Sequence, residues 1–378
     1  MRIAMIGSRG VGSNYGGIER VLDELCPKLA DLGHQVHVYS KADTGFTGYN
    51  GVQSIATRSI GGKHLDNLTR AIFALKQAYG QYDVLHFHAL GPGVLSLLTR
   101  LGGQRSVVTV HALDHKRDKW GTFARMCLVG AERTLIGSAD RVTVVSESLR
   151  RYFAERYDAT AEFIPNGIPN KQHVPPGTLL TAHDLVPGKY VLFASRLTPE
   201  KGCHDLIAAF NTLDATLLAQ SGMKLVIAGG TAPENYLAEL RAQADPERVR
   251  FVGHLGGDEL AEVFSNAYAF VLPSYIEGMS MALLEAIAYA LPTLASDIPE
   301  NRAVLGDFGT YCAPRNVADL RRELDRLIRS PDAAFRMSDR MARLARPDWR
   351  AVAARYDHLY RTVMRRPRAI AAGAPVNA

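Results

Sequence analysis

The strongest constraint on the fold of this chain is an alternation of apolar strand-like segments with amphipathic helical segments, which occurs twice along the sequence. The first series opens with a strand (residues 2–7), a Gly-rich turn (7–17), a helix (18–32) and a second strand (35–40). Gly33 follows the helix, where a glycine commonly ends one. This order predicts a doubly wound parallel sheet, in which ligands bind beyond the carboxyl ends of the strands.

A dinucleotide-binding fold is the obvious alternative for this opening, because Gly7, Gly10 and Gly12 partly imitate its glycine fingerprint. Their spacing differs from Gly-x-Gly-x-x-Gly, and no acidic residue ends the second strand to hold a ribose. The sequence therefore disfavours a dehydrogenase.

The apolar face of the helix at residues 18–32 is predicted to be Val21, Leu22, Leu25, Leu29 and Leu32.

A second α/β series begins at Tyr190, after a segment rich in Pro, Asn and Gly (162–187) that is typical of a domain boundary. We expect an N-terminal domain at residues 1–170 and a C-terminal domain at 171–347. Each should contain a doubly wound sheet, and the two domains should face each other across a cleft that holds the substrate.

Length and composition agree with a two-domain globular protein, since 378 residues exceed one ordinary core and 47% of them are apolar. No apolar run could span a bilayer, and the N-terminal segment does not resemble a signal peptide. Four cysteines without metal-type or disulfide-type spacing suggest a reducing cytosol. A net charge of +6 is compatible with an anionic substrate, nucleic acid or an anionic membrane surface.

The stretch 273–286 follows an apolar run and carries two carboxylates, Glu277 and Glu285. Ser280 is placed to cap a helix that Pro292 must end, which would leave the first backbone N–H groups of that helix unpaired. Those donors and the positive end of the helix dipole suit a phosphate or a sugar oxygen. By itself, the stretch is equally compatible with an exposed loop glutamate and a solvated helix glutamate.

Two cations, Arg196 and Lys201, lie on one loop after the predicted strand 190–194, and such a pair suits the two phosphates of a diphosphate. A basic surface loop would look the same.

Three histidines, His86, His88 and His111, fall at or near the carboxyl ends of predicted strands. His111 is the best candidate for a site, because a polar and basic segment follows it. That segment would either contact a phosphate-bearing or membrane-borne acceptor or form a solvated loop. Its relevant residues are Lys116, Arg117, Lys119 and Trp120.

Taken in order, these residues resemble the GT-B glycosyltransferases of the retaining family 4 type, and the resemblance covers nearly the whole chain. The first half more narrowly resembles a bacterial subgroup that includes rhamnosyltransferases of capsule, exopolysaccharide or O-antigen assembly. Each element is weak alone, whereas the ordered set is specific. The elements are Gly16-Gly17-Ile18-Glu19, His111, Pro165-Asn166-Gly167, Arg196 with Lys201, Gly229-Gly230, Val252-Gly253-His254, and Glu277 with Glu285.

The resemblance implies a role for each element. Gly16 and Gly17 would let backbone amides approach the donor diphosphate. Arg196 and Lys201 would neutralise that diphosphate as the nucleotide leaves. Glu285 would bind the ribose hydroxyls.

The resemblance also implies that Glu277 faces the donor sugar and that His111 lies near the sugar and the acceptor. Family members are thought to retain anomeric configuration by front-side attack, in which the leaving phosphate takes the acceptor proton. No metal and no other cofactor is then expected. Backbone donors around the sugar would come from Gly278, Met279, Ser280 and Met281.

The sequence departs from the family pattern at Ala290, where members often have Gly, and at Met279-Ser280, where they often have Phe-Gly. The first difference should affect helix capping, and the second bears on which sugar fits. The segment 348–366 should form a helix that returns to the N-terminal domain, and residues 367–378 should be disordered.

We therefore expect a cytoplasmic enzyme, peripheral on the inner membrane, that moves a hexose or deoxyhexose, with rhamnose as one candidate. The donor would be a nucleoside-diphosphate sugar, and the acceptor a growing saccharide or polyprenyl-diphosphate-saccharide. The other expected partner is the anionic inner membrane, and no nucleic acid is expected. A GT-B-shaped sugar-nucleotide epimerase and a non-catalytic sugar-nucleotide or polysaccharide-binding subunit remain alternatives.

Overall fold

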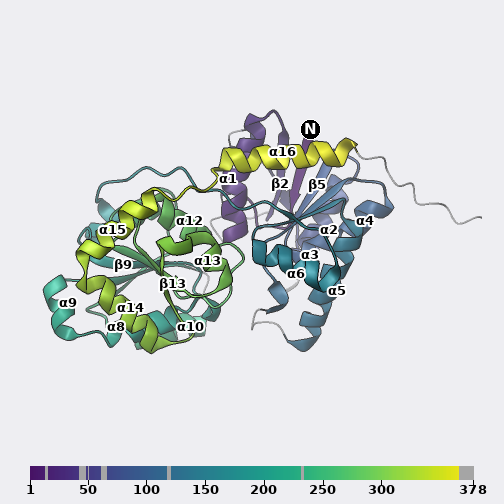
Figure 1. Cartoon of the computed structure of the whole chain (residues 1–378). Coiled ribbons are helices and arrows are strands. Elements are labelled where there is room, and N and C mark those ends of the chain that lie inside the picture. The colour runs from purple at the N-terminus through teal and green to yellow at the C-terminus, as the bar shows by residue number, and fades with distance from the viewer. Residues whose placement is uncertain are drawn as a thin grey trace, which may run out of the picture. The chain divides into compact units, whose positions relative to one another are not determined.

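The computed structural model describes residues 1–12, 16–41, 48–49, 51–60, 66–116, 121–230 and 234–365. The chain divides into two compact units, Met1–Asn166 with Trp349–Ala378, and Gly167–Asp348. Figure 1 colours the chain by residue number, and the yellow helix α16 (Trp349–Arg365) belongs to the first unit. The predicted disorder at 367–378 lies outside the described residues.

Within the described residues, the first unit is built on an eight-stranded sheet in the order β3-β4-β2-β1-β5-β6-β7-β8. Neighbouring strands run parallel, except that β3 and β4 are antiparallel. The strand order reverses between β1 and β5, so the loops after these two strands border the topological switch point. The strands are β1 (Arg2–Ile6), β2 (Gln35–Lys41), β3 (Gly48–Tyr49), β4 (Val52–Thr57), β5 (Val84–His88), β6 (Ser106–Val110), β7 (Arg141–Val144) and β8 (Glu162–Phe163).

The first helix of this unit confirms most of its predicted packing face. Its inward residues Val21, Leu22, Leu25 and Leu29 are buried, whereas Leu32 is 45% exposed and was wrongly assigned to that face. Leu32 lies beyond the last turn, where Gly33 at φ +84° redirects the chain. Besides α16, the helices are α1 (Gly17–Asp31), α2 (Asp66–Ala78), α3 (Leu90–Gly93), α4 (Ser96–Leu101), η1 (Asp114–Lys116), α5 (Thr122–Ser138) and α6 (Glu147–Tyr157).

Helix α16 is attached to the sheet of the first unit by side-chain hydrogen bonds. The Tyr360 hydroxyl lies 2.7 Å from His86 Nδ1, and the Tyr356 hydroxyl lies 3.2 Å from Thr109 Oγ1. His86 Nε2 in turn contacts Thr109 Oγ1 at 2.7 Å. The buried Nδ1 of His86 therefore has its hydrogen-bond partner on the C-terminal helix.

The second unit contains, among its described residues, a six-stranded parallel sheet in the order β11-β10-β9-β12-β13-β14. Its order reverses between β9 and β12. The strands are β9 (Tyr190–Ala194), β10 (Lys224–Ala228), β11 (Val249–Gly253), β12 (Ala269–Leu272), β13 (Thr293–Ser296) and β14 (Thr310–Cys312). The helices are α7 (Thr178–Ala182), η2 (Pro199–Lys201), α8 (Cys203–Asn211), α9 (Ala215–Ser221), α10 (Glu234–Gln243), α11 (Gly257–Ser265), α12 (Met281–Ala288), α13 (Pro299–Leu305), η3 (Gly306–Phe308), α14 (Val317–Arg329) and α15 (Pro331–Ala342).

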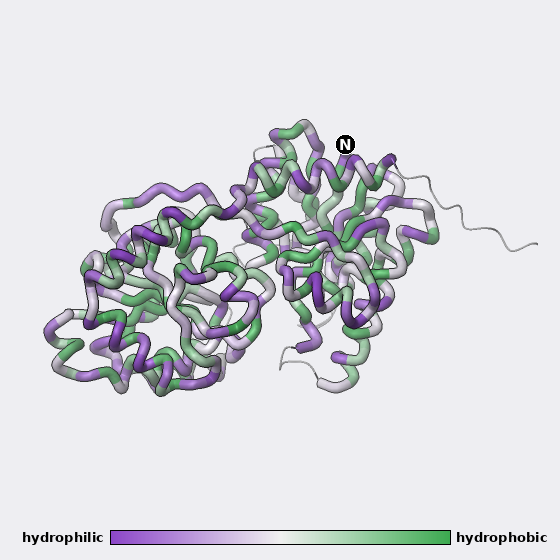
Figure 2. Tube along the Cα trace, viewed as in Figure 1, coloured by the Kyte–Doolittle hydropathy of each residue, from purple (hydrophilic) through white to green (hydrophobic). Residues whose placement is uncertain are grey.

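The central strands of each sheet lie in the core of their unit. All residues of β5, β6, β9, β12 and β13 are buried, as expected of parallel strands covered by helices. Figure 2 shows hydrophobic residues recurring along the strands, and hydrophobic alternating with hydrophilic residues along the helices. Each sheet thus presents a rigid edge from which loops project.

Candidate functional site

Two loops that carry predicted site residues lie together in the second unit. Residues 195–202 follow β9 and residues 273–280 follow β12, so both loops border the switch point between these adjacent strands. They are joined through the backbone, since Tyr275 N donates a hydrogen bond to Glu200 O at 2.8 Å. The topology therefore brings the predicted cations and carboxylates to one sheet edge.

Two glycines allow these loops to approach each other and the loop after β10. A Cβ on Gly202 would lie 2.3 Å from Pro273 O, and the residue has φ +69°, so a side chain is excluded on both counts. A Cβ on Gly229 would lie 2.1 Å from Ser195 O. These glycines are required by the chain's own packing.

The two loops are also joined by an ion pair. Lys201 Nζ donates to Glu277 Oε1 at 2.6 Å, and the two side chains are only 13% and 7% exposed. A pair so far removed from water interacts more strongly than a surface salt bridge, and loss of either partner leaves a poorly solvated charge. Arg196 lies on the same loop and is half-buried.

The predicted cap of the following helix is confirmed. Ser280 Oγ accepts a hydrogen bond from Leu283 N at 3.4 Å, and α12 begins at Met281. Gly278, Ser280 and Met281 are buried and Met279 is half-buried. The positive end of the helix dipole therefore lies next to the loop that carries Glu277.

Glu285 lies inside α12 and is 6% exposed, which contradicts the alternative of a solvated helix glutamate. Glu277, at 7% side-chain exposure, is likewise not an exposed loop residue. Both carboxylates are held within the protein near the first turns of one helix.

A cluster that sequence reasoning missed supports the 273–280 loop. The Tyr275 hydroxyl donates to Asp205 Oδ2 at 2.5 Å and lies 3.1 Å from His204 Nε2. The Arg315 guanidinium lies 4.0 Å from the centroid of the Tyr275 ring. Burial and the Asp205 carboxylate raise the pKa of Tyr275. The only sequence signal for Tyr275 was its position two residues before Glu277.

In the first unit, the Gly-rich loop is stabilised by two carboxylates of α1. Glu19 is buried and accepts a hydrogen bond from Arg9 N at 2.8 Å, and Asp23 accepts one from Gly12 N at 2.7 Å. Gly16 is the N-cap of α1 in an extended conformation, and a Cβ on Gly17 would meet nothing within 4 Å. Among the described residues, local packing therefore does not require glycine at position 17.

Three histidine rings lie close together, two in β5 and one directly after β6, and we call them the histidine stack (His86, His88, His111). The ring centroids of His86 and His88 are 4.2 Å apart, and those of His88 and His111 are 5.3 Å apart. Burial lowers the pKa of His86 to about 3 and that of His111 to about 4, and burial with the neighbouring histidines holds the pKa of His88 well below its ordinary value. All three rings are therefore neutral near pH 7.

The stack favours one tautomer of His111. His88 Nδ1 lies 3.1 Å from His111 Nε2, so one of the two rings donates to the other. Within the described residues, the buried Nε2 of His88 has no hydrogen-bond partner. An unpartnered N–H is costlier there than an unpartnered lone pair, so we expect His88 Nδ1–H to donate. His111 then carries its proton on Nδ1, as a hydrogen-bond donor.

The segment after His111 is anchored by a buried carboxylate, Glu132 of α5. Its Oε1 lies 2.6 Å from His115 Nδ1, and its Oε2 accepts hydrogen bonds from the Tyr152 and Tyr157 hydroxyls. Lys116 Nζ lies 5.4 Å from the centroid of the Tyr152 ring. The predicted acceptor-side residues Arg117, Lys119 and Trp120 lie outside the described residues.

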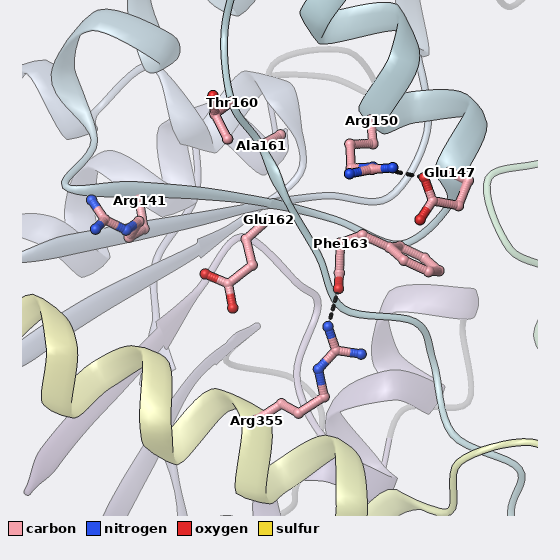
Figure 3. A pocket seen from close by; sticks show the side chains of 8 residues that line it. All are labelled: Arg141, Glu147, Arg150, Thr160, Ala161, Glu162, Phe163 and Arg355. Atoms are coloured by element: carbon pink, nitrogen blue, oxygen red, sulfur yellow. Dashed lines mark hydrogen bonds and ion pairs between the residues drawn. The ribbon is translucent and has the colours of Figure 1, made fainter.

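A pocket of about 600 Å³ in the first unit contains none of the predicted site residues (Figure 3). It lies beside the edge strand β8. Two of its arginines have partners in the pocket wall, since Arg150 pairs with Glu147 at 2.6 Å and Arg355 donates to Phe163 O. Arg355 thereby covers an edge carbonyl that would otherwise be open to another strand. The lining residues are Arg141, Glu147, Arg150, Thr160, Ala161, Glu162, Phe163 and Arg355.

Among the residues that the structure describes, no three or more His, Cys, Asp or Glu side chains gather as metal ligands would. No helix in the described ranges has the length and apolar character needed to cross a bilayer.

Comparison with protein families gives one match in each unit. The model of "Glycosyltransferase Family 4" matches residues 15–172, and that of "Glycosyl transferases group 1" matches residues 185–346. The first match includes Gly16, Gly17 and His111, and the second includes Arg196, Lys201, Glu277 and Glu285.

Individual proteins resemble the chain over nearly its full length. It is 29% identical to glycogen synthase of Mycobacterium tuberculosis, with 95% of this chain and 94% of that protein covered. It is 26% identical to phosphatidyl-myo-inositol mannosyltransferase of Mycolicibacterium smegmatis, with 92% and 90% covered. The structure of Anabaena Alr3699/HepE in complex with UDP-glucose superposes with a TM-score of 0.76 at 16% identity, covering 96% of this chain and 100% of that one.

Proposed function

Since this chain is a glycosyltransferase of the GT-B, family 4 type, we propose that it moves a hexose, or a deoxyhexose such as rhamnose, from a nucleoside-diphosphate sugar to a growing saccharide. We further propose a polyprenyl-linked acceptor, transfer with retention of anomeric configuration, and a place in cell-surface polysaccharide synthesis on the cytoplasmic face of the inner membrane. A nucleotide-sugar donor is supported by the similarity to HepE, which binds UDP-glucose. A lipid-linked acceptor is supported by the similarity to a phosphatidyl-myo-inositol mannosyltransferase.

The observation that carries the donor proposal is the convergence at the β9–β12 switch point. Two cations, Arg196 and Lys201, and the N-terminus of α12 lie at one edge with two buried carboxylates. Cations and a helix N-terminus suit the donor diphosphate, whereas Glu277 and Glu285 suit hydroxyls of the sugar and the ribose. A site for a phosphate anion alone would not need the two carboxylates.

The Lys201–Glu277 ion pair suggests how this edge responds to the donor. The diphosphate offers Lys201 a second anionic partner, and the sugar hydroxyls offer Glu277 new hydrogen-bond donors. In this proposal Lys201 and Arg196 stabilise the negative charge that develops on the leaving diphosphate. The leaving phosphate oxygen accepts the proton of the acceptor hydroxyl, so the reaction requires no carboxylate nucleophile and no metal.

For the first unit, we propose that His111 contacts the acceptor through Nδ1–H, the tautomer that His88 favours. A neutral imidazole with its Nε2 already occupied can orient a hydroxyl, but it is a poor general base at that nitrogen. We also propose that Gly16 and Gly17 leave room for the donor phosphates near α1, and that Lys116 and its neighbours in sequence contact the acceptor.

A donor screen tests the proposal. Thermal unfolding is measured with UDP-, GDP- and dTDP-sugars, and a bound donor at about 100 times its Kd should stabilise the protein by about 2.7 kcal/mol. Lys201→Met should abolish the shift. Lys224→Met is the matched control, because Lys224 also pairs with a carboxylate (Asp184, 2.7 Å) but lies at the amino end of β10.

Transfer is then assayed with the donor that binds and a polyprenyl-diphosphate-saccharide acceptor, and the anomeric configuration of the product is read by NMR. Retention at the new linkage is the expected result. Sugar-nucleotide conversion in the absence of any acceptor would instead identify an epimerase and refute the proposal. An equal donor shift in the wild type and in Lys201→Met would refute the assignment of the site.

A further inference from the structure

Tyr275 is bound to the segment after β9 through both its backbone and its side chain. Its N–H donates to Glu200 O at 2.8 Å, and its hydroxyl donates to Asp205 Oδ2 at 2.5 Å. Glu200 directly precedes Lys201, and Asp205 lies in the first turn of α8, which begins at Cys203. The two hydrogen bonds of Tyr275 therefore flank the residue whose cation pairs with Glu277.

The hydrogen bonds around the Tyr275 hydroxyl have one consistent direction. A carboxylate only accepts, so the single proton of this hydroxyl goes to Asp205. Burial and the Asp205 carboxylate raise the pKa of Tyr275, which keeps that proton in place. The hydroxyl oxygen then accepts from His204 Nε2–H at 3.1 Å, and His204 Nδ1 accepts from the Tyr236 hydroxyl at 2.8 Å. A chain of hydrogen bonds in which each side chain has a partner specifies one position of the Tyr275 ring.

The ring of Tyr275 is also held by a residue from a third segment. The Arg315 guanidinium lies 4.0 Å from the ring centroid, and Arg315 belongs to the loop between β14 and α14. Helix α14 packs on α8 (Figure 1). The backbone of Arg315 is left-handed at φ +59°, a conformation that persists in a non-glycine residue where surrounding contacts fix it. Residues from α8 and from the loop after β14 thus converge on one tyrosine.

We propose that Tyr275 is a positioning residue that holds the 273–280 loop so that Glu277 meets the donor sugar. This inference rests on the proposed function for the role of Glu277. In the donor-free protein, the Lys201–Glu277 contact of 2.6 Å also joins the two loops. The donor engages Lys201 with its diphosphate and Glu277 with its sugar hydroxyls, and their mutual contact weakens. Tyr275 is bonded to α8 rather than to the ligand, so it keeps the loops together in that state.

The variant Tyr275→Phe tests the proposal, because it keeps the ring and removes only the hydroxyl. Release of nucleoside diphosphate is measured with the UDP-, GDP- or dTDP-sugar that the wild type turns over. The kcat should fall at least about tenfold, since misplacement of a reacting group by about 1 Å can cost about 100-fold. The KM for the donor should change less than about threefold, because Arg196, Lys201 and Glu285 are unaltered.

Tyr268→Phe is the matched control. Tyr268 directly precedes β12, whereas Tyr275 follows the carboxyl end of the same strand, and the Tyr268 hydroxyl donates to Leu327 O at 2.8 Å. Both tyrosines are half-buried, so the two variants should lose comparable stability. Tyr268→Phe should nevertheless keep the wild-type kcat, because its hydroxyl lies at the amino end of β12, away from the site.

Substitutions of Asp205 test the partner of the Tyr275 hydroxyl. Asp205→Asn should lose less than about threefold in kcat, since an amide oxygen still accepts the hydrogen bond. Asp205→Ala should lose as much as Tyr275→Phe does. The double variant Tyr275→Phe/Asp205→Ala should be no slower than either single variant, because both remove the same contact.

Hydrogen exchange of the donor-free protein provides a measurement that does not depend on turnover. The amides of residues 275–281 should exchange at least about tenfold faster in Tyr275→Phe than in the wild type, and at the wild-type rate in Tyr268→Phe. Unchanged exchange in Tyr275→Phe would overturn the proposal, as would equal kcat values for the two tyrosine variants. A wild type that turns over no nucleotide sugar, although Tyr275→Phe still accelerates this exchange, would refute the proposed function and support the hold of Tyr275 on the loop.

Discussion

The Lys201–Glu277 ion pair makes a prediction in which stability and activity should separate. Each side chain is replaced by methionine, alone and together, and thermal unfolding and sugar transfer are measured for all four proteins. Methionine resembles both side chains in length and carries no charge. The three variants therefore form a double-mutant cycle around one contact of 2.6 Å.

The magnitude follows from the geometry. At an effective dielectric constant of about 20, two unit charges 2.6 Å apart attract by about 6 kcal/mol, and the loss of their hydration offsets most of that. Removal of one partner leaves the other charge only 13% or 7% exposed, and this should cost about 3 kcal/mol. For a domain of this size, the melting temperature should fall by about 6–12 °C.

The double variant should recover most of that loss, because an apolar pair has no charge to desolvate. It should nevertheless stay inactive, since neither the cation for the diphosphate nor the carboxylate for the sugar is present. Melting losses that simply add in the double variant would show that the two groups do not interact. Wild-type transfer by the double variant would refute the role of both residues.

Other predictions concern the backbone and the buried rings. Gly202→Ala should destabilise the second unit by about 3 kcal/mol or more, whereas Gly222→Ala, at φ +64° with nothing within 4 Å of a Cβ, should cost only about 1 kcal/mol in thermal melts. Ala290→Gly should increase the free energy of unfolding by about 0.5 kcal/mol, because Ala290 has φ +53°. The melting temperature should rise slightly as a result. The histidine stack has depressed pKa values when folded, so its unfolded rings bind protons first as the pH falls below about 6.5. Denaturant unfolding at pH 5.5 should show a loss of up to about 4 kcal/mol relative to pH 7.5, and a pH-independent stability would contradict the burial of these rings.

Local features of the fold were predictable because their signals lie within a few residues. Ser280 caps its helix as expected, with Leu283 N as the donor. The strand at Tyr190–Ala194 has its predicted bounds, because a run of apolar residues bounded by polar ones leaves few alternatives. Leu32 was misassigned because periodicity alone does not show where the last turn of a helix ends.

Contacts between distant residues were beyond the sequence. Lys201 and Glu277 are 76 positions apart, and only the strand order, which places β12 beside β9, makes their loops neighbours. The support of Tyr275 by Asp205 depends on the same adjacency. The tautomer of His111 depends on His88, which a single sequence cannot pair with it. The roles of the site residues stay predictions until a donor is bound.

The attachment of α16 to the first unit has a consequence for synthesis. Residues 167–348 form the second unit as one continuous segment, whereas the first unit is interrupted by that segment and closed by Trp349–Arg365. On the ribosome, the second unit can therefore complete its fold while His86 still lacks the Tyr360 hydroxyl. The first unit is therefore translated first but completes its fold last. A nascent chain stalled before Trp349 should expose an incomplete N-terminal half to chaperones and proteases.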